Sequence, residues 1–328
     1  MLLIALKSNS TYNFLLVPLL AIALWIKSFL QPALYPFYTG ENAMILYQPV
    51  NALLGKSPFA SHLVALIFTI VLSILILRIK VQYSFIRVRT VLPSFLFILI
   101  TCGLHDLQAI HPVYFAALFL ILTIDRIFSA YEKDKIHSNA FDSGILLSIG
   151  SLFYFNLVFF FPFLWIGFII LKPKVNWREY ILSTLGFLFP WLAASAWYAA
   201  TGQTTELLDV IKSNLSSHQF FLKDNLPVQI YMGYLGLLTF MASILILSQY
   251  DGKKISTRKY FKAFFWIFLI AFVLMVASPA VSQEIIVLLA IPLTYLISNY
   301  LIFMKHQIWG EVFLFLLTAG VVALQFFG

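Results

Sequence analysis

The sequence is poor in charged residues and in cysteine. Only 10% of its 328 residues are charged, whereas a soluble domain carries about 25%, so a soluble enzyme or binding module is excluded. The single cysteine, Cys102, excludes an intrachain disulfide and a metal cluster built on cysteine. The sequence also lacks a glycine-rich phosphate loop and the HExxH and GxSxG motifs. It therefore carries none of the standard local signatures of nucleotide binding, zinc proteolysis or serine hydrolysis.

Long apolar runs take the place of those motifs. Hydrophobic residues make up 62% of the chain, and they gather in runs that can cross a hydrocarbon core of about 30 Å. Such spans are helical, because an isolated strand leaves its backbone unpaired in lipid. We predict an all-α polytopic bundle of about eleven spans, a single integral membrane domain over residues 1–328. The predicted spans are 13–30, 59–77, 91–104, 112–129, 143–157, 159–171, 180–200, 229–248, 262–277, 285–304 and 309–327.

The positions of Lys and Arg predict the orientation of these spans. Cytoplasmic loops carry an excess of basic residues, and we interpret 13–30 as a retained first span. With the N-terminus inside and the C-terminus outside, all but four of the 21 Lys and Arg residues are cytoplasmic; the exceptions are Lys27, Lys56, Lys212 and Lys223. This asymmetry explains the net charge of +8 without nucleic acid as a partner. The predicted location is the bacterial inner membrane, with the loops 31–58 and 201–228 on the extracytoplasmic side.

The segment 143–171 decides whether that orientation is consistent. If it crosses once, the basic clusters at 172–178 and 253–262 lie on the side opposite to the earlier clusters. Two short crossings, or a hairpin that enters and returns, keep all of them on one side. The stretch FNLVFFFPF, around Asn156 and Pro162, is a suitable place for the break.

Two extracytoplasmic stretches hold the candidate catalytic residues. Glu41 lies in YTGENAM, and HDLQAIHP holds His105, Asp106 and His111. A solvated loop explains Glu41 without any function. Helix-end chemistry explains the others, because Pro112 suits a first helical position and Asp106 can cap free N–H groups. The functional interpretation instead brings these side chains together as a general base with metal or phosphate ligands.

The loop 201–228 predicts an amphipathic helix on the outer leaflet. Its apolar stripe consists of Leu207, Leu208, Ile211, Leu215 and Leu222. The polar residues that would contact lipid phosphates are Lys212, His218 and Lys223. A surface helix without a ligand explains the same pattern.

Residues 10–200 resemble the membrane glycosyltransferases of the C fold (GT-C). The resemblance rests on HPVYFAALFLILTIDRIF and on SIGSLFYFNLVFFFPFLWIGFIILKPKVNWREYILSTLGFLFPWL, after a first span and a long acidic loop. It implies an enzyme that takes a sugar from a polyprenyl-phosphate carrier, with Glu41 and Asp106 as catalytic acids. The chain departs from the family in having one acid in its first loop and no extracytoplasmic arginine. As a whole it also resembles an uncharacterised bacterial inner-membrane family, sometimes labelled a beta-carotene monooxygenase.

These observations favour a lipid-linked sugar transferase, or a degenerate relative of one. In this hypothesis Glu41 is the general base, a divalent cation assists, and Asp106 supports the base or binds the cation. The residues that would bind the carrier phosphate are His105, His111, Lys212, His218 and Lys223. The alternative is a non-catalytic membrane subunit of an envelope or secretion complex. A transporter and a histidine-metal oxygenase are less favoured, since no charges lie at mid-span and the histidines match no standard metal spacing.

Overall fold

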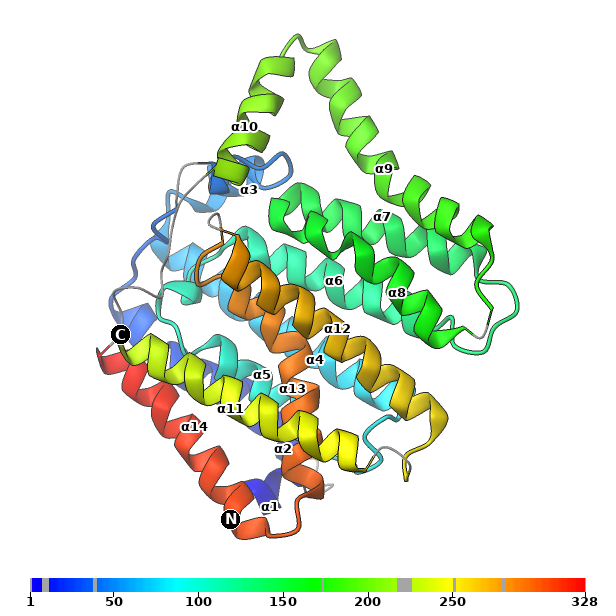
Figure 1. Ribbon diagram of the computed structural model, residues 1–328. Coiled ribbons are helices and arrows are strands. Elements are labelled where there is room, and N and C mark those ends of the chain that lie inside the picture. Colours follow the sequence, from blue (N-terminus) through cyan, green and yellow to red (C-terminus); the bar gives the residue numbers. More distant parts are fainter. Residues whose placement is uncertain are drawn as a thin grey trace.

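The chain forms a bundle of helices, drawn in Figure 1 from the computed structural model. The structure describes residues 2–7, 12–37, 40–172, 174–216, 226–249, 252–278 and 281–327. Within those residues it contains helices and no β-strand. The predicted all-α class is therefore confirmed.

Each predicted apolar run coincides with a helix. These helices are α2 (Tyr12–Leu30), α4 (Pro58–Tyr83), α5 (Leu92–Thr101), α6 (Pro112–Phe128), α7 (His137–Phe153), α8 (Phe161–Leu171), α9 (Trp177–Ala200), α11 (Leu226–Ser248), α12 (Ile255–Ala277), α13 (Ile285–Phe303) and α14 (Gln307–Phe327). Among the described residues, six helices are long and apolar enough to cross a membrane: α4, α9, α11, α12, α13 and the Gln307–Gln325 part of α14. The remaining elements are α1 (Leu2–Lys7), α3 (Gln48–Leu54), α10 (Thr204–Ser216) and the 3₁₀ helices η1 (Glu41–Ala43), η2 (Asp106–Gln108) and η3 (Phe155–Phe160).

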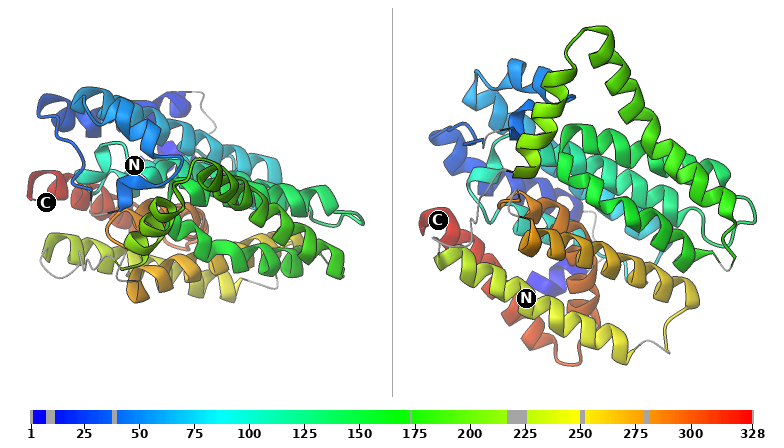
Figure 2. Two further views of the ribbon diagram at one scale, coloured as in Figure 1. Left: turned by 90° about the horizontal axis from the view of Figure 1, so that it is seen from above. Right: turned by 45° about the horizontal axis from the view of Figure 1, so that its top comes forward.

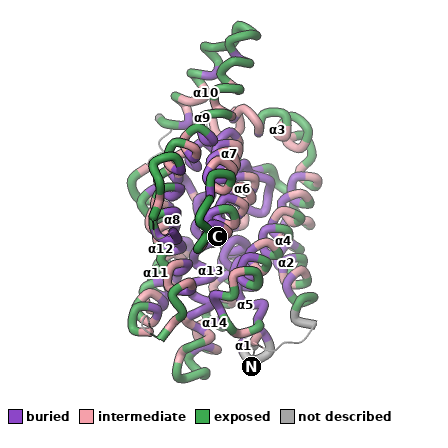
Figure 3. The backbone as a smooth tube through the Cα atoms, turned by 90° about the vertical axis from the view of Figure 1, so that its right-hand side faces the viewer, coloured by how far each residue is buried: buried purple, intermediate pink, exposed green. Residues whose placement is uncertain are grey.

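Helix α13 lies at the centre of the bundle, and α9 lies at its edge. Nearly every residue of α13 is buried, against α5, α11 and α12. Its Tyr295 hydroxyl donates to the carbonyl oxygen of Ile76 at 2.8 Å. Helix α9 instead exposes large apolar side chains such as Phe189 and Leu192, and Figure 3 shows exposed residues along it. This contrast is what a bundle surrounded by hydrocarbon requires, because lipid tails are as apolar as a protein core.

Two glycines allow α7 and α9 to approach closely. A Cβ atom on Gly144 would lie 2.2 Å from the carbonyl oxygen of Ser183, and one on Gly186 would lie 2.3 Å from that of Phe141. Small residues at such crossings let helix backbones pack together where no hydrophobic effect drives association. The pair fixes α9 against α7, and α7 packs in turn against α6.

The predicted break in 143–171 is present. Helix α7 ends at Phe153, the short η3 turns the chain, and α8 begins at Phe161. The two ends of this hairpin return to the same side: Asn139 of α7 donates to the carbonyl oxygen of Arg126 at 2.9 Å, and Leu171 at the end of α8 accepts from Lys259 at 3.0 Å. Lys259 also lies 5.3 Å from the ring of Tyr131, in the loop that precedes α7.

The bundle has two chemically different ends. At one, called here the Glu41 end, α6 and α13 begin and α7 ends. At the other, called here the basic end, the connections around Arg87, Arg126, Lys172 and Lys253 meet. Figure 2 shows the end of α9 and the start of α10 projecting together beyond the other helices. Helix α10 then folds back to contact η1 at the Glu41 end.

The predicted helix is present as α10, but its buried face differs in part from the predicted apolar stripe. The face that packs on the protein carries Leu207, Val210, Ile211 and Asn214, whereas Leu208 is 54% exposed and Leu215 is 50% exposed. The reason is that η1 and the segment around Tyr47 offer α10 an apolar partner within the chain. Leu222 lies outside the described residues.

Candidate functional site

His111, at the start of α6, forms a hydrogen bond with Glu41. His111 is the N-cap of this helix, and its Nδ1 accepts a hydrogen bond from the backbone N–H of Val113 at 3.1 Å. Since Nδ1 is an acceptor, the ring proton of the neutral histidine lies on Nε2. Nε2 is 2.7 Å from Glu41 Oε1 and donates to it. His111 therefore serves the helix with one nitrogen and the carboxylate with the other.

Aromatic rings enclose the histidine and fix its orientation. The His111 ring centroid lies 4.6 Å from that of Tyr35, 5.7 Å from that of Phe37 and 6.1 Å from that of Tyr154. The His111 side chain is fully buried, while that of Glu41 keeps 11% of its surface exposed. The acid is thus the member of this pair that a substrate can reach.

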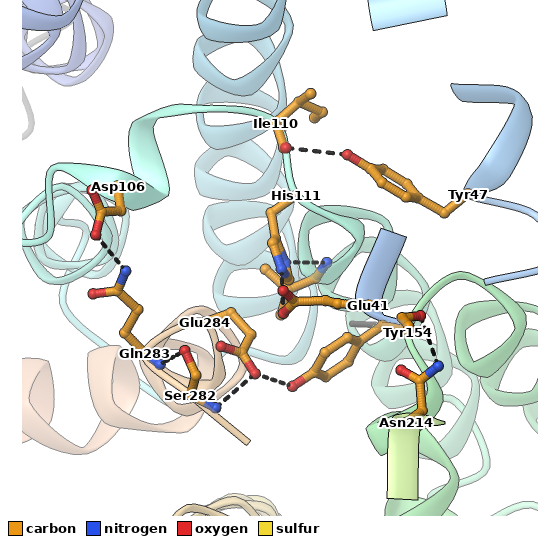
Figure 4. Close-up of polar contacts among 12 residues, drawn as sticks. Glu41, Tyr47, Asp106, Ile110, His111, Tyr154, Asn214, Ser282, Gln283 and Glu284 are labelled. Carbon is orange, nitrogen blue, oxygen red and sulfur yellow. Dashed lines mark hydrogen bonds and ion pairs between the residues drawn. The ribbon is translucent and has the colours of Figure 1, made fainter. Parts of the chain in front are cut away.

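A second carboxyl group, Glu284, enters the cluster from the start of α13. Its Oε1 accepts hydrogen bonds from the Tyr154 hydroxyl at 2.8 Å and from the Ser282 backbone N–H at 2.9 Å. Its Oε2 is buried without a hydrogen-bond partner among the described residues. Complete burial raises the pKa of Glu284, and the negative charge of Glu41 raises it further. Figure 4 shows Glu41, His111, Tyr154 and Glu284 gathered around one point.

Helix α10 and a glycine turn place Glu41 in this cluster. Gly40, immediately before it, has φ +93°, a conformation that glycine adopts without strain. The carbonyl oxygen of Gly40 accepts a hydrogen bond from Asn214 Nδ2 at 2.8 Å. Farther along, the Leu46 N–H donates to Leu152 at the end of α7 at 3.2 Å. The acid is thereby tied both to α10 and to the α7–η3 turn.

A groove of about 550 Å³ opens beside this segment. Its walls come from the segment after η1, from the end of α7, from α9 and from the start of α10. The lining residues are Ile45, Leu46, Gln48, Leu152, Pro190, Ala193, Ala194, Trp197, Tyr198, Gln203 and Glu206. Ile45 follows Glu41 by four residues and Leu152 precedes Tyr154 by two, so the groove and the acid cluster share the same two segments of chain.

Asp106 lies beside the cluster and not within it. It is exposed on η2, where its Oδ2 accepts a hydrogen bond from Gln283 Nε2 at 2.7 Å. Figure 4 shows Asp106 to one side, linked through Gln283 to the segment that carries Glu284. The carboxyl group that interacts electrostatically with Glu41 is Glu284. Glu284 thus joins Glu41 and His111 in the cluster, whereas Asp106 contacts Gln283, and a joint role of Glu41 and Asp106 stays a prediction.

The other predicted site residues are dispersed. His105 Nδ1 is 3.2 Å from the Ser28 hydroxyl, and burial together with the charge of Lys27 lowers its pKa. Lys212 is exposed on α10. His218 and Lys223 lie outside the described residues.

The hydrogen bonds of the histidine ring nitrogens give no support to a histidine-metal site. His62 accepts from the Ala33 N–H at Nε2, 3.2 Å away, and its Nδ1 lies 2.7 Å from the Gln108 carbonyl oxygen. Both nitrogens of His62, like both of His111, already have protein partners. In the part of the chain that the structure describes, no group of three or more His, Cys, Asp or Glu side chains is placed to hold a metal ion.

Sequence reasoning passed over Glu284 and Tyr154. Glu284 counts among the acids that the sequence predicts to be extracytoplasmic, and it is the only acid between Asp251 and Glu311. An acid directly before a long apolar run, on the same side as Glu41, is the signal that could have identified it. Tyr154 has no such signal, because tyrosines are common throughout the chain.

Comparison with known proteins identifies a family and no activity. Residues 35–327 match the model of a family of unknown function, DUF6427. No curated protein and no solved structure matches the chain. The match spans most of the sequence, so the chain belongs to DUF6427.

Proposed function

We propose that this member of DUF6427 is a membrane enzyme that transfers a sugar from a polyprenyl-phosphate carrier at the extracytoplasmic face, in the manner of the C-fold glycosyltransferases. The observation that carries the proposal is a glutamate, Glu41, hydrogen-bonded to a buried histidine beside a second, buried carboxyl group. Two carboxyl groups in environments of different polarity are a common arrangement for acid–base chemistry. The choice of substrate class rests on the resemblance of residues 10–200.

The proposal includes an orientation. About eleven apolar segments enter the bacterial inner membrane, with 143–171 as two short crossings or a hairpin that enters and returns. The basic end is cytoplasmic, and the Glu41 end is extracytoplasmic. The excess of Lys and Arg at one end supports this orientation, because positively charged loops are retained in the cytoplasm. The N-terminus is then inside and the C-terminus outside.

Glu41 acts in this proposal as the general base. It accepts the proton of an acceptor hydroxyl while that oxygen attacks the anomeric carbon of the donor sugar. The bond between this carbon and the phosphate oxygen breaks, and its electron pair leaves with the polyprenyl phosphate. The hydrogen bond from His111 Nε2 orients the carboxylate for proton transfer. His111 is therefore a positioning residue here and not a phosphate ligand, because both of its nitrogens are engaged.

Glu284 and Tyr154 support this base. The raised pKa of Glu284 favours its neutral form, which lies beside the charge of Glu41 without repelling it. The Tyr154 hydroxyl and the Ser282 N–H fix its position. The groove along α9 receives the donor sugar, and the exposed apolar face of α9 leaves a path to the lipid for the carrier chain.

The carrier phosphate contacts His105 and Lys212 in this proposal, together with His218 and Lys223, which lie outside the described residues. A divalent cation remains an optional partner of the phosphate. The role of Glu41 rests on its hydrogen bond to His111 and does not depend on that cation.

The test replaces Glu41→Gln in a strain that lacks the chromosomal gene and is complemented from a plasmid. Glutamine keeps an oxygen to accept from His111 but is not a base, so transfer to the glycan should fall about 100-fold or more. Polyprenyl-linked sugar should accumulate in extracted lipids. Asp209→Asn, at an exposed acid on α10, is the matched control and should keep the wild-type glycan profile.

A non-catalytic subunit is the second candidate. The observation in its favour is that His111 and Glu284 are fully enclosed, as they would be in a purely structural cluster. On that hypothesis the Glu41→Gln strain keeps the wild-type glycan and lipid profiles, and a partner protein co-purifies in stoichiometric amount. Such a result, at normal expression of the variant, would refute the enzyme proposal.

A further inference from the structure

A basic pocket lies at the opposite end of the bundle from Glu41. It has a volume of about 470 Å³ and lies among the segment after α4, the α11–α12 connection and the end of α13. Its cationic lining residues are Arg87, Lys253 and Lys254, and no carboxylate occurs among the described lining residues. Hydroxyl and amide groups complete the wall, from Ser248, Gln249 and Thr257.

The cations in this pocket are held close together. Lys253 is half-buried, with its Nζ 5.1 Å from the ring centroid of Phe303 and 5.3 Å from that of Phe261. Burial lowers the pKa of Lys253, and the charge of Arg87 lowers it further. Repulsion between the two side chains is relieved when an anion lies between them.

A buried hydrogen-bond donor beside this pocket lacks an acceptor among the described residues. Lys253 Nζ donates to Asn299 Oδ1 at 2.9 Å, while the Nδ2 atom of the same buried amide has no acceptor in the described part of the chain. Helix α12 begins here with Lys254 as its N-cap, and no side chain caps its first N–H groups. Free N–H groups at a helix start favour negative charge, which adds to the charge of the three cations.

A second, apolar pocket of about 380 Å³ lies along α11 and α12. Phe261 lines it, and the ammonium group of Lys253, a lining residue of the basic pocket, lies 5.3 Å from the Phe261 ring centroid, so the two pockets are neighbours. The lining residues of the apolar pocket are Ser243, Ile246, Leu247, Arg258, Phe261, Lys262, Phe265 and Leu296. In α11 and α12 these positions begin at the residues next to the basic pocket, Leu247 and Arg258, and extend away from the α11–α12 connection.

We propose that the two pockets form a binding site for an anionic phospholipid, with the phosphate at Arg87, Lys253 and Lys254 and an acyl chain in the groove between α11 and α12. The cationic lining of the first pocket and the apolar lining of the second favour this ligand. A phosphate group needs the cations, and basic pockets between membrane helices are typical sites for anionic headgroups. A free phosphate ion would leave the adjoining apolar groove unfilled. The site is independent of the chemistry proposed for Glu41.

The experiment measures lipid binding to the purified full-length protein in neutral detergent. Native mass spectrometry would count retained phosphatidylglycerol, with zwitterionic phosphatidylcholine, whose net charge is zero, as the comparison. We expect phosphatidylglycerol to bind and to raise the unfolding temperature, and phosphatidylcholine to do neither. The double variant Arg87→Gln/Lys253→Gln should weaken phosphatidylglycerol binding roughly tenfold or more.

A matched control removes the same charge elsewhere at the basic end. Lys133→Gln/Lys135→Gln changes two exposed lysines outside both pockets and should bind phosphatidylglycerol like the wild type. Equal weakening by both double variants would overturn the proposal, since net charge alone would then explain binding. Equal protection by inorganic phosphate would overturn it in favour of a free anion. Equal binding of the two lipids would overturn it as well.

Discussion

His111 combines two functions that the sequence allowed as alternatives. Its place before Pro112 predicted a residue that ends a loop, and it does cap α6. The same ring also donates to Glu41, because capping through Nδ1 leaves the proton on Nε2. A structural role and a positioning role are here consequences of one tautomer.

Glu284→Gln should change how stability depends on pH. The folded protein raises the pKa of Glu284 above its unfolded value of about 4.3. The folded state therefore binds this proton more tightly, and the associated stability is complete below about pH 4 and is lost as pH rises through the folded pKa. Glutamine resembles the protonated acid and keeps an oxygen for Tyr154 and Ser282.

The measurement is thermal unfolding in detergent across that pH range. The unfolding temperature of the wild type should fall relative to that of Glu284→Gln as pH rises from about 4 to the raised pKa, and the difference should then stay constant. Asp106→Asn, at an exposed carboxyl, serves as the control and should follow the wild type. If the unfolding temperatures of wild type and Glu284→Gln changed with pH in parallel, burial would not disfavour the charged form of Glu284.

The acid pair shows why the candidate site could be predicted only in part. The sequence offered a cluster of Glu41 with Asp106 and the histidines as one alternative, and the structure shows the His111–Glu41 contact together with Glu284, which was not among the candidates. Glu41 and Glu284 are far apart in the chain, and they meet because α13 packs through the centre of the bundle. Helix α13 is apolar on every side, so no stripe in its sequence tells which face meets α6.

The helices themselves were predictable because length and apolarity decide them. Every predicted run contains a helix, and the break between α7 and α8 falls within FNLVFFFPF as expected. The close approach of α7 and α9 was not predicted, since a glycine in an apolar run has many explanations. Only the packed structure shows that Gly144 and Gly186 lie opposite backbone atoms.

Gly186→Ala should therefore destabilise the bundle by separating α9 from α7. The added Cβ would lie 2.3 Å from the carbonyl oxygen of Phe141, a backbone atom that cannot rotate away. We expect a loss of about 1–3 kcal/mol, the usual cost of overpacking. Gly233→Ala on α11 is the matched control, because nothing lies within 4 Å of its Cβ position. It should be neutral or stabilising by up to about 1 kcal/mol. Equal unfolding temperatures for the two variants would contradict the close α7–α9 packing.

At the scale of the whole molecule, the α7–α8 hairpin determines which segments share a side. Segments before it supply Glu41 and His111, and segments after it supply Asn214 and Glu284. The hydrogen bond of 2.8 Å between Asn214 and Gly40 joins the two sets at one end of the bundle. A single crossing over 143–171 would place them on opposite sides of the membrane. The candidate site thus exists only if the chain returns at η3.

Cysteine labelling tests this topology directly. In a Cys102→Ser background, single cysteines would be introduced as Lys133→Cys, Lys174→Cys and Gln203→Cys and treated with a membrane-impermeant maleimide. Gln203→Cys should react in intact spheroplasts, and the other two only after permeabilisation, because both lie in basic connections. Lys133 precedes the hairpin, so its expected reaction is the same whether 143–171 crosses once or twice. If Lys174→Cys reacts in intact spheroplasts and Gln203→Cys does not, the segment crosses once, and Glu41 and Glu284 cannot belong to one site.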